Sequence, residues 1–296
     1  AATNNGLYRS TNSGINFTQI LSASTSKDYF DEIEIHPTNE NIVYAIKNAV
    51  NDLYTEFYKS TDFGQNFTNK SSWPSNASLI VTPNNQKRAE ISVTPASPNL
   101  IYALLAGEYG GGTGLYGFYK SLDAGETWTH TCCGTGPGGT ASTSNANILG
   151  YNSTGADNGG QYYYDLALQA DPNNPNKVHA AGVMHWISLN GGQTFTNTAS
   201  WSDAANVKYV HADIHDIFIR NNQVWVSCDG GIFLSVDSGK LSFNRRQYGI
   251  QGTEFWGFGM GHKDADVMLG GTYHNSHLMK NGNVYQNGWI SYTGSA

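Results

Sequence analysis

The stretch Ser60-Thr61-Asp62-Phe63-Gly64-Gln65-Asn66-Phe67 decides how the chain is interpreted, because its pattern occurs five times. Each copy reads Ser-x-Asp/Asn-x-Gly and is soon followed by an aromatic residue. The copies, here called boxes, begin at Ser10, Ser60, Ser121, Ser188 and Ser235. They are spaced by 50, 61, 67 and 47 residues. A repeat of this length indicates supersecondary units that stack side by side.

Each box predicts a tight hairpin turn. The side-chain oxygen of its third residue accepts hydrogen bonds from backbone N–H groups, and the glycine supplies a positive φ. The aromatic residue that follows begins the next strand and packs into the core. We therefore interpret the third residues of the boxes as architectural: Asn12, Asp62, Asp123, Asn190 and Asp237.

A second element recurs between the boxes and consists of an alternating strand, a turn rich in Pro or Asn, and another strand. Glu32–Pro37 before Ile42–Ala45 is one copy, and Glu90–Pro95 before Leu100–Ala103 is another. Each unit then has four short strands, two from this pair and one on each side of its box. No long stretch has a helical period. The sequence predicts an all-β protein, a β-propeller of four-stranded antiparallel blades.

The repeats predict one propeller domain over residues 1–296 with about six blades. The expected bounds are a half-blade at 1–22 and full blades near 29–72, 87–131, 162–199, 211–247 and 254–290. The chain begins at a third strand and box, so the first blade is expected to lack its first two strands. The half-blade either closes a ring with the last strands or belongs to a longer propeller. We favour the longer propeller, because only seven residues follow Trp289.

Composition excludes several classes of protein. Only 13% of residues are charged, about half the usual ~25%, while 12% are aromatic, which disfavours disorder and helical bundles. The net charge is −7 and the basic residues form no patch, so we expect no nucleic-acid partner. No apolar run approaches the ~18 residues that span a bilayer. Ala1-Ala2-Thr3 looks like a processed end, consistent with a removed secretion signal.

Two of the three cysteines, Cys132 and Cys133, are adjacent in a glycine-rich stretch. They are either free thiols or partners in an eight-membered ring. An oxidising, extracellular setting favours the ring. We predict that Cys132 and Cys133 are linked.

The boxes carry a resemblance to a known group. The chain resembles the Asp-box (BNR-repeat) propellers, which include sialidases, xyloglucanase-type glycoside hydrolases and sortilin-like receptors. Residues 211–243, with His-x-Asp-x-His, an apolar strand, Asp-Gly-Gly and a box, are similar to secreted bacterial proteins labelled sortilin-like or glycosyl-hydrolase-like. The resemblance implies a secreted or cell-surface location. That group often continues with Gly-Gly-x-Gln-Asp-Asn-Gly, but Tyr273 and His274 replace the Gln and Asp here, so their roles do not carry over.

In a propeller, the loops before the first strand of each blade and after its second strand line one face, opposite the boxes. His211, Asp213 and His215 are the richest set at such a place. If the segment is extended, they share one side at a two-residue rise of ~6.6–6.8 Å. Three interpretations remain open. The set hydrogen-bonds neighbouring blades, or it holds a metal ion, or Asp213 is a catalytic carboxylate tuned by a histidine.

Other residues occupy matching places. Asp229 follows the second strand of the same unit, and Asp213 with Asp229 is our candidate pair for acid–base or nucleophilic chemistry. Asp31, Asp165 and His185 lie near the same face in other units. The candidate binding residues are His211, His215, Glu254, Trp256, Tyr273 and His274.

The function expected first is a secreted or cell-surface module for binding and scaffolding, with glycans as its ligands. Aromatic residues such as Tyr162–Tyr164 either pack between blades or stack on sugar rings. The alternative is a glycoside hydrolase acting on a polysaccharide through paired carboxylates, and a further alternative is a sortilin-like peptide receptor. A sialidase is disfavoured because no arginine cluster for an acidic sugar is visible. The expected partner is a polysaccharide or another surface protein. We expect no cofactor, unless a metal binds at His211, Asp213 and His215.

Overall fold

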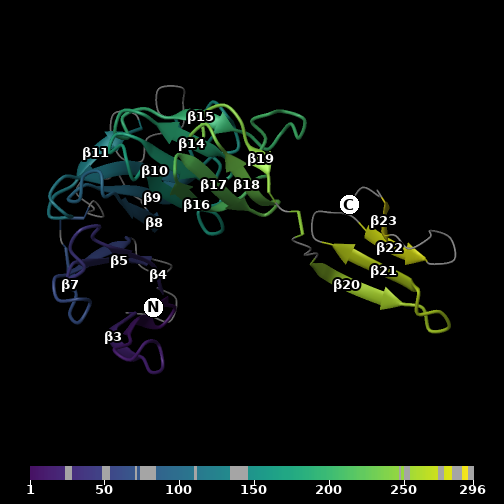
Figure 1. Cartoon of the computed structure of the whole chain (residues 1–296), viewed down its shortest axis with the longest axis horizontal. Helices are drawn as coiled ribbons and strands as arrows, with labels where there is room; N and C mark the ends of the chain where they lie inside the picture. Colours follow the sequence, from purple (N-terminus) through teal and green to yellow (C-terminus); the bar gives the residue numbers. More distant parts are fainter. Residues whose placement is uncertain are drawn as a thin grey trace. The chain divides into compact units, whose positions relative to one another are not determined.

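A computed structural model describes residues 1–23, 29–48, 54–70, 72–73, 85–109, 112–133, 146–246, 248–249, 254–272, 277–281 and 289–292. Every regular element in these ranges is a β-strand, as predicted (Figure 1). Among the described residues, therefore, no helix is long and apolar enough to cross a membrane. Two compact units, residues 1–246 and 247–296, divide the chain, and each is described by itself. The assignment of all 296 residues to one domain stays a prediction.

The strands of each sheet are antiparallel and follow chain order. The first sheet holds β1 (Ala2–Thr3), β2 (Gly6–Arg9) and β3 (Thr18–Ser22). The second holds β4 (Tyr29–Ile35), β5 (Val43–Asn48), β6 (Glu56–Ser60) and β7 (Thr68–Asn69). The third holds β8 (Asn85–Val93), β9 (Ile101–Tyr109), β10 (Gly112–Ser121) and β11 (Thr129–Cys132). The predicted four-stranded blades are thus confirmed for the second and third sheets.

Three further sheets have the same form. The fourth holds β12 (Ala167–Ala170), β13 (Val178–Ala181), β14 (His185–Ser188) and β15 (Thr196–Ala199). The fifth holds β16 (Ile214–Arg220), β17 (Gln223–Cys228), β18 (Gly231–Ser235) and β19 (Asn244–Arg245). The second unit contains the sixth, with β20 (Phe255–Met260), β21 (Val267–Thr272), β22 (His277–Asn281) and β23 (Trp289–Tyr292). In the first unit the first strands β4, β8, β12 and β16 contact one another in succession.

The prediction that the first blade lacks both its first strands was wrong for one of them. Strand β1 pairs antiparallel with β2, with Ala2 opposite Leu7 and Thr3 opposite Gly6. The sheet therefore has three strands rather than two. Two residues are too few to show an alternating pattern, and the pairing partner alone defines this strand.

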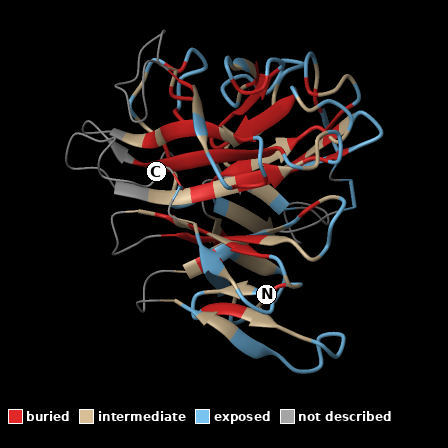
Figure 2. Cartoon of the chain, turned by 90° about the vertical axis from the view of Figure 1, so that its left-hand side faces the viewer, coloured by how far each residue is buried: buried red, intermediate tan, exposed pale blue. Residues whose placement is uncertain are grey.

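Strand β9 shows how the core forms between neighbouring sheets. Alternate side chains of a strand point to opposite faces. Tyr102 and Leu104 accordingly pack toward the fourth sheet, while Ile101 and Leu105 pack toward the second. Because both faces are covered, the strand is a continuous apolar run, and Figure 2 shows the buried residues following the strands of the stacked sheets.

The boxes form the turns that their sequence predicts. The Ser60 hydroxyl donates to Asp62 at 2.8 Å and accepts from the Gly64 N–H at 2.9 Å, while Asp62 accepts from the Asn66 N–H at 2.9 Å. The bond from the Gly N–H to the Ser hydroxyl recurs in all five boxes. Hydrogen bonds from the Asn66 side chain and backbone and from Ser60 lower the pKa of Asp62 to about 2. Gly64 has a φ of 72°, as predicted, and Phe63 before it has a φ of 60°, which the sequence did not predict.

Asp123→Ala is expected to lower the melting temperature by about 2–5 °C. The carboxylate accepts bonds from Ser121 and from the Thr127 N–H, each at 2.8 Å, and alanine leaves these donors to water. Asp123→Asn is the matched control and should retain most of the stability, because Asn190 accepts the equivalent bond in its own box at 3.0 Å. Calorimetry measures both variants. An unchanged melting temperature for Asp123→Ala would show that the box carboxylate is not architectural.

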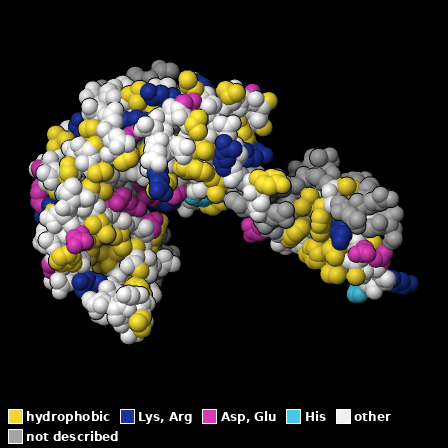
Figure 3. All heavy atoms as spheres, in the orientation of Figure 1, with side chains coloured by type: hydrophobic (Ala, Val, Ile, Leu, Met, Phe, Trp, Pro, Cys, Tyr) yellow, Lys and Arg dark blue, Asp and Glu magenta, His cyan; other side chains and the backbone are white. Residues whose placement is uncertain are grey.

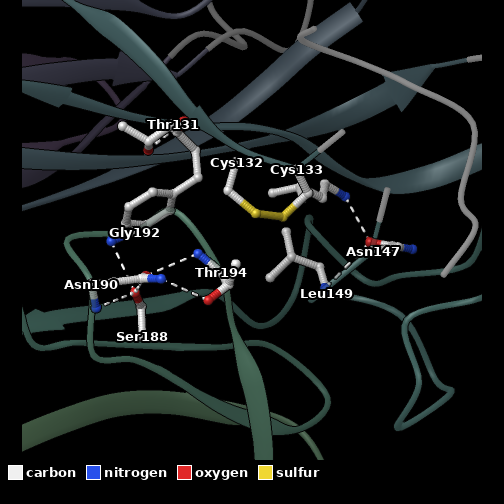
Figure 4. The surroundings of a disulfide bond; sticks show 11 residues. Thr131, Cys132, Cys133, Asn147, Leu149, Ser188, Asn190, Gly192 and Thr194 are labelled. Carbon is white, nitrogen blue, oxygen red and sulfur yellow. Dashed lines mark hydrogen bonds between the residues drawn. A yellow bond between two sulfur atoms is a disulfide. The ribbon is translucent and has the colours of Figure 1, made fainter. Parts of the chain in front are cut away.

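The two adjacent cysteines are joined, so the predicted ring is confirmed (Figure 4). Cys132 and Cys133 are each 6% exposed and belong to the core between the third and fourth sheets. Leu149 lies beside the sulfur atoms in that core. The ring thus ends β11 with an apolar surface that packs against the neighbouring blade. Cys228 is a buried free thiol.

Candidate functional site

Three segments meet where the first strands of the fourth and fifth sheets lie side by side. They are the turn at 161–165 before β12, the segment 211–213 before β16, and Asp229 between β17 and β18. Gln161 Nε2 donates to Asp213 Oδ1 at 2.7 Å, and the Asp229 N–H donates to the Asp213 carbonyl at 3.2 Å. The backbone bond thus brings Asp213 and Asp229 together within the fifth sheet, and Gln161 links Asp213 to the segment that precedes the fourth sheet.

Asp229 is the centre of a polar network. Its Oδ1 lies 2.8 Å from His215 Nε2, and both its oxygens lie 3.0 Å from the Tyr164 hydroxyl, which donates to them. The rings of Tyr164 and His215 meet edge to face with centroids 5.0 Å apart. Tyr164 is 46% exposed. The carboxylate is thus held by two side chains at a surface that remains open to solvent.

The premise of an extended segment at 211–215 is wrong. Asp213 has a φ of 65°, in the left-handed region, so the alternation of sides is lost before β16 begins. His211 instead packs over Gly230, where an added Cβ would lie 2.3 Å from the His211 Cβ. His211 Nδ1 lies 3.2 Å from the Ala212 carbonyl. Among the described residues no group of three or more His, Cys, Asp or Glu side chains is arranged to hold a metal ion.

Asp165 is the most constrained acid of this region. It is 2% exposed, and its Oδ2 has no hydrogen-bond partner among the described residues. Burial and the nearby Asp213 raise its pKa to about 7. Burial also raises the pKa of Asp213, with a smaller contribution from Asp229 and with Gln161 opposing it. The carboxyl groups of Asp165 and Asp213 therefore bind a proton more readily than a solvent-exposed aspartate does.

A second acidic group surrounds Arg88 on β8. The guanidinium lies 3.0 Å from Glu90 and 3.6 Å from Asp31, and it donates to the Tyr162 carbonyl at 3.4 Å. Burial and Glu90 raise the pKa of Glu34 to about 7. Figure 3 shows Asp and Glu side chains gathered in one patch on the first unit, with basic side chains close by. The sequence analysis did not identify Arg88 and Glu90 as site residues. The pattern that could have identified them is a polar residue at every second position of β8, the first strand of its blade.

The remaining predicted residues lie elsewhere. Glu254 and Trp256 belong to the second unit, where Trp256 on β20 is 72% exposed. Tyr273 and His274 fall outside the described residues. His185 lies in the core rather than at a loop, 3.0 Å from His179 and 2.6 Å from Thr198.

The described site offers carboxyl groups, an amide, an imidazole and a tyrosine hydroxyl. Such groups hydrogen-bond to the hydroxyls of a polar ligand, and a pair of carboxyl groups is also the arrangement that general acid–base chemistry requires.

Comparison with known proteins identifies the fold. No family model matches the chain, and no curated protein matches it. Among solved structures, an ancestral GH74 enzyme superposes with a TM-score of 0.53 at 15% identity over 98% of this chain and 36% of that one. A GH74 enzyme from Niastella koreensis gives 0.54 at 17% identity over 97% of this chain and 42% of that one. YCF48 from Cyanidioschyzon merolae superposes with a TM-score of 0.46 at 10% identity. The match covers 89% of this chain and 70% of the YCF48 chain.

These identities show the fold alone. The chain spans less than half the length of each of the two GH74 chains. Together with the stacked four-stranded antiparallel sheets, the similarity to GH74 enzymes establishes a β-propeller architecture.

Proposed function

We propose that this chain is a glycan-binding propeller module and that the Asp213–Asp229 site is its binding site. The observation that carries the proposal is the convergence of Gln161, Tyr164 and His215 on these two carboxylates from two different sheets. Hydroxyl groups of a sugar are recognised by such planar polar side chains. Secretion and membership of the Asp-box propellers, with the sortilin-like branch, belong to this proposal and are supported by the five box turns and the cysteine ring.

Exposed tyrosines beside the site provide the apolar part of a sugar-binding surface. Tyr163 is 69% exposed, and its ring lies 5.7 Å from that of Tyr162. Tyr151 lies in the loop that precedes the turn at 161–165 and is 46% exposed. Its N–H donates to the Asp157 carboxylate in the same loop at 2.8 Å. Aromatic rings at such positions stack on the apolar faces of sugar rings while the carboxylates bind the hydroxyls.

Tyr163→Ala is expected to weaken binding to a soluble polysaccharide at least about tenfold, which corresponds to ~1.4 kcal/mol of lost stacking. Affinity electrophoresis in gels containing xyloglucan, mannan or another soluble glycan measures the retardation. Phe63→Ala is the matched control, because Phe63 is 50% exposed in a box turn and Ala124 occupies the equivalent position with a similar φ. Lack of retardation of the unaltered protein in every glycan tested, or equal losses in both variants, would contradict the proposal.

A second candidate function is hydrolysis of the bound glycan. It is favoured by one observation, the unpartnered and buried Asp165 oxygen with a pKa of about 7 beside Asp213. A carboxyl group of this kind is suited to protonate a leaving oxygen. Release of reducing ends from xyloglucan, abolished in Asp213→Asn and in Asp165→Asn, would support it. Binding without any release of reducing ends would leave the module without hydrolytic activity.

A further inference from the structure

The proposed site carries more negative than positive charge. Asp165, Asp213 and Asp229 are its acids, and His215 is the one titratable nitrogen within hydrogen-bond distance of them among the described residues. Arg88 is already engaged by Asp31 and Glu90. A negatively charged site disfavours uronic and sialic acids, which are themselves negatively charged, and favours a ligand with a positive charge.

Asp165 supplies the second, independent observation. Its side chain is 2% exposed, yet Oδ2 lacks a partner among the described residues, which is costly for a buried polar atom. The residue closes the turn whose Gln161 and Tyr164 side chains bond to Asp213 and Asp229, and its N–H donates to the Gln161 carbonyl at 3.0 Å. The pKa of Asp165 is raised most by burial and next by the charge of Asp213. The unpartnered oxygen lies in the same turn as Gln161 and Tyr164, and a donor from a ligand would satisfy it.

The donor that fits is an ammonium group. It presents three N–H bonds and a full positive charge, which pairs with carboxylates and favours their ionised form. A coordinated metal ion fits less well, because the described donors do not converge in a group of three. Saccharides with free amino groups combine this cation with the hydroxyls and ring faces that Tyr163 and Tyr164 suit.

We propose that the Asp165, Asp213 and Asp229 site binds saccharides that carry unsubstituted amino groups, with β-linked glucosamine oligomers as the ligand class. This inference rests on the proposed glycan-binding function and names its ligand. The inference predicts different affinities for three β-linked sugar oligomers that differ only in the substituent at one carbon atom: an amine, an acetamide or a hydroxyl.

Isothermal titration calorimetry with the full chain at pH 7 tests the proposal with three probes: the glucosamine tetramer, the N-acetylglucosamine tetramer and cellotetraose. The glucosamine tetramer is expected to bind at least about tenfold more tightly than the other two. This preference should shrink as the salt concentration rises from ~50 to ~300 mM, because screening weakens the charge pairing.

Asp213→Asn is expected to abolish the preference for the amine, so that the three tetramers bind this variant with affinities within about threefold of one another. Asparagine tolerates the left-handed conformation of residue 213, so the variant should fold, and circular dichroism and the melting temperature check this. Glu40→Gln is the matched control, because it removes one exposed charge from the β4–β5 loop and should leave the preference intact.

The outcomes separate this inference from the proposed function. Equal binding of the three tetramers would overturn the amine inference and leave glycan binding standing. Loss of the preference in Glu40→Gln as well as in Asp213→Asn would show general charge attraction and would also overturn it. If neither these tetramers nor the soluble polysaccharides bind, both proposals fail together.

Discussion

Asp165→Asn is expected to raise the free energy of unfolding by about 2–4 kcal/mol at pH 8 and by less than about 1 kcal/mol at pH 4. The pKa of Asp165 is raised from 3.8 to about 7 by burial and Asp213. Above pH 7 the folded protein therefore holds a buried charge that the unfolded chain carries in water. Below about pH 4 both states are protonated and this cost disappears, so a neutral asparagine helps only at higher pH. Urea unfolding at the two pH values measures the difference.

Asp171→Asn is the matched control for this prediction. Asp171 is also 2% exposed, but it accepts from Lys177 Nζ at 2.7 Å and from the Asn173 N–H at 2.8 Å. Neutralising it leaves a buried ammonium group without its partner, so Asp171→Asn should destabilise the protein by about 3–5 kcal/mol at pH 7. The two variants would thus show that the ionised Asp165 destabilises the fold, whereas the equally buried Asp171 stabilises it. A destabilising Asp165→Asn at pH 8 would show that Asp165 is structural.

His179→Gln is expected to reduce the loss of stability between pH 7 and pH 5 by about 2 kcal/mol. His179 and His185 are both fully buried, with Nδ1 of the first 3.0 Å from Nε2 of the second. Burial, His185 and Lys177 lower the pKa of His179 well below its usual 6.5, and burial lowers that of His185 to about 3. As the pH falls below 6.5, the unfolded chain binds protons that the folded protein excludes, so folding becomes less favourable.

The measurement is the difference between two pH profiles. Acids with raised pKa values, such as Asp165, shift stability in the opposite direction over the same range, but they are common to both proteins and cancel. The glutamine variant keeps a polar side chain of similar reach and does not titrate. Unfolding curves in urea at pH 5, 6 and 7 give the profiles. Parallel profiles for the two proteins would mean that the His179–His185 pair accepts protons without unfolding.

The box turns show what local chemistry determines. The acceptor oxygen of Asp62 and the N–H of Asn66 are four residues apart, so the sequence already contains both partners of the bond. The left-handed residue before each glycine escaped prediction, because Phe63, Ala124 and Ser238 are not residue types that favour a positive φ. These residues adopt a positive φ because hydrogen bonds across the turn, such as those to Ser60 and Asp62, span the residue before the glycine.

The site shows the opposite case. The sequence predicts Asp213, Asp229 and His215 as site residues from their positions around β16 and β17, but it does not predict Gln161. The bonds that define it join Gln161 to Asp213 and Tyr164 to Asp229, which are 52 and 65 residues apart. The extended segment on which a metal-binding set depended does not exist, because Asp213 turns away at a φ of 65°.

By itself, the sequence determined the repeat, its all-β blades and the turns of the boxes, and it predicted the link between Cys132 and Cys133. Each depends on side chains within a few residues of one another or on a period of two along a strand. The tertiary structure alone decided that Asp165 is buried beside Asp213, that Arg88 lies between Asp31 and Glu90, and that His185 is paired in the core. These contacts depend on how neighbouring sheets stack, and stacking brings together residues whose relative positions no local pattern records.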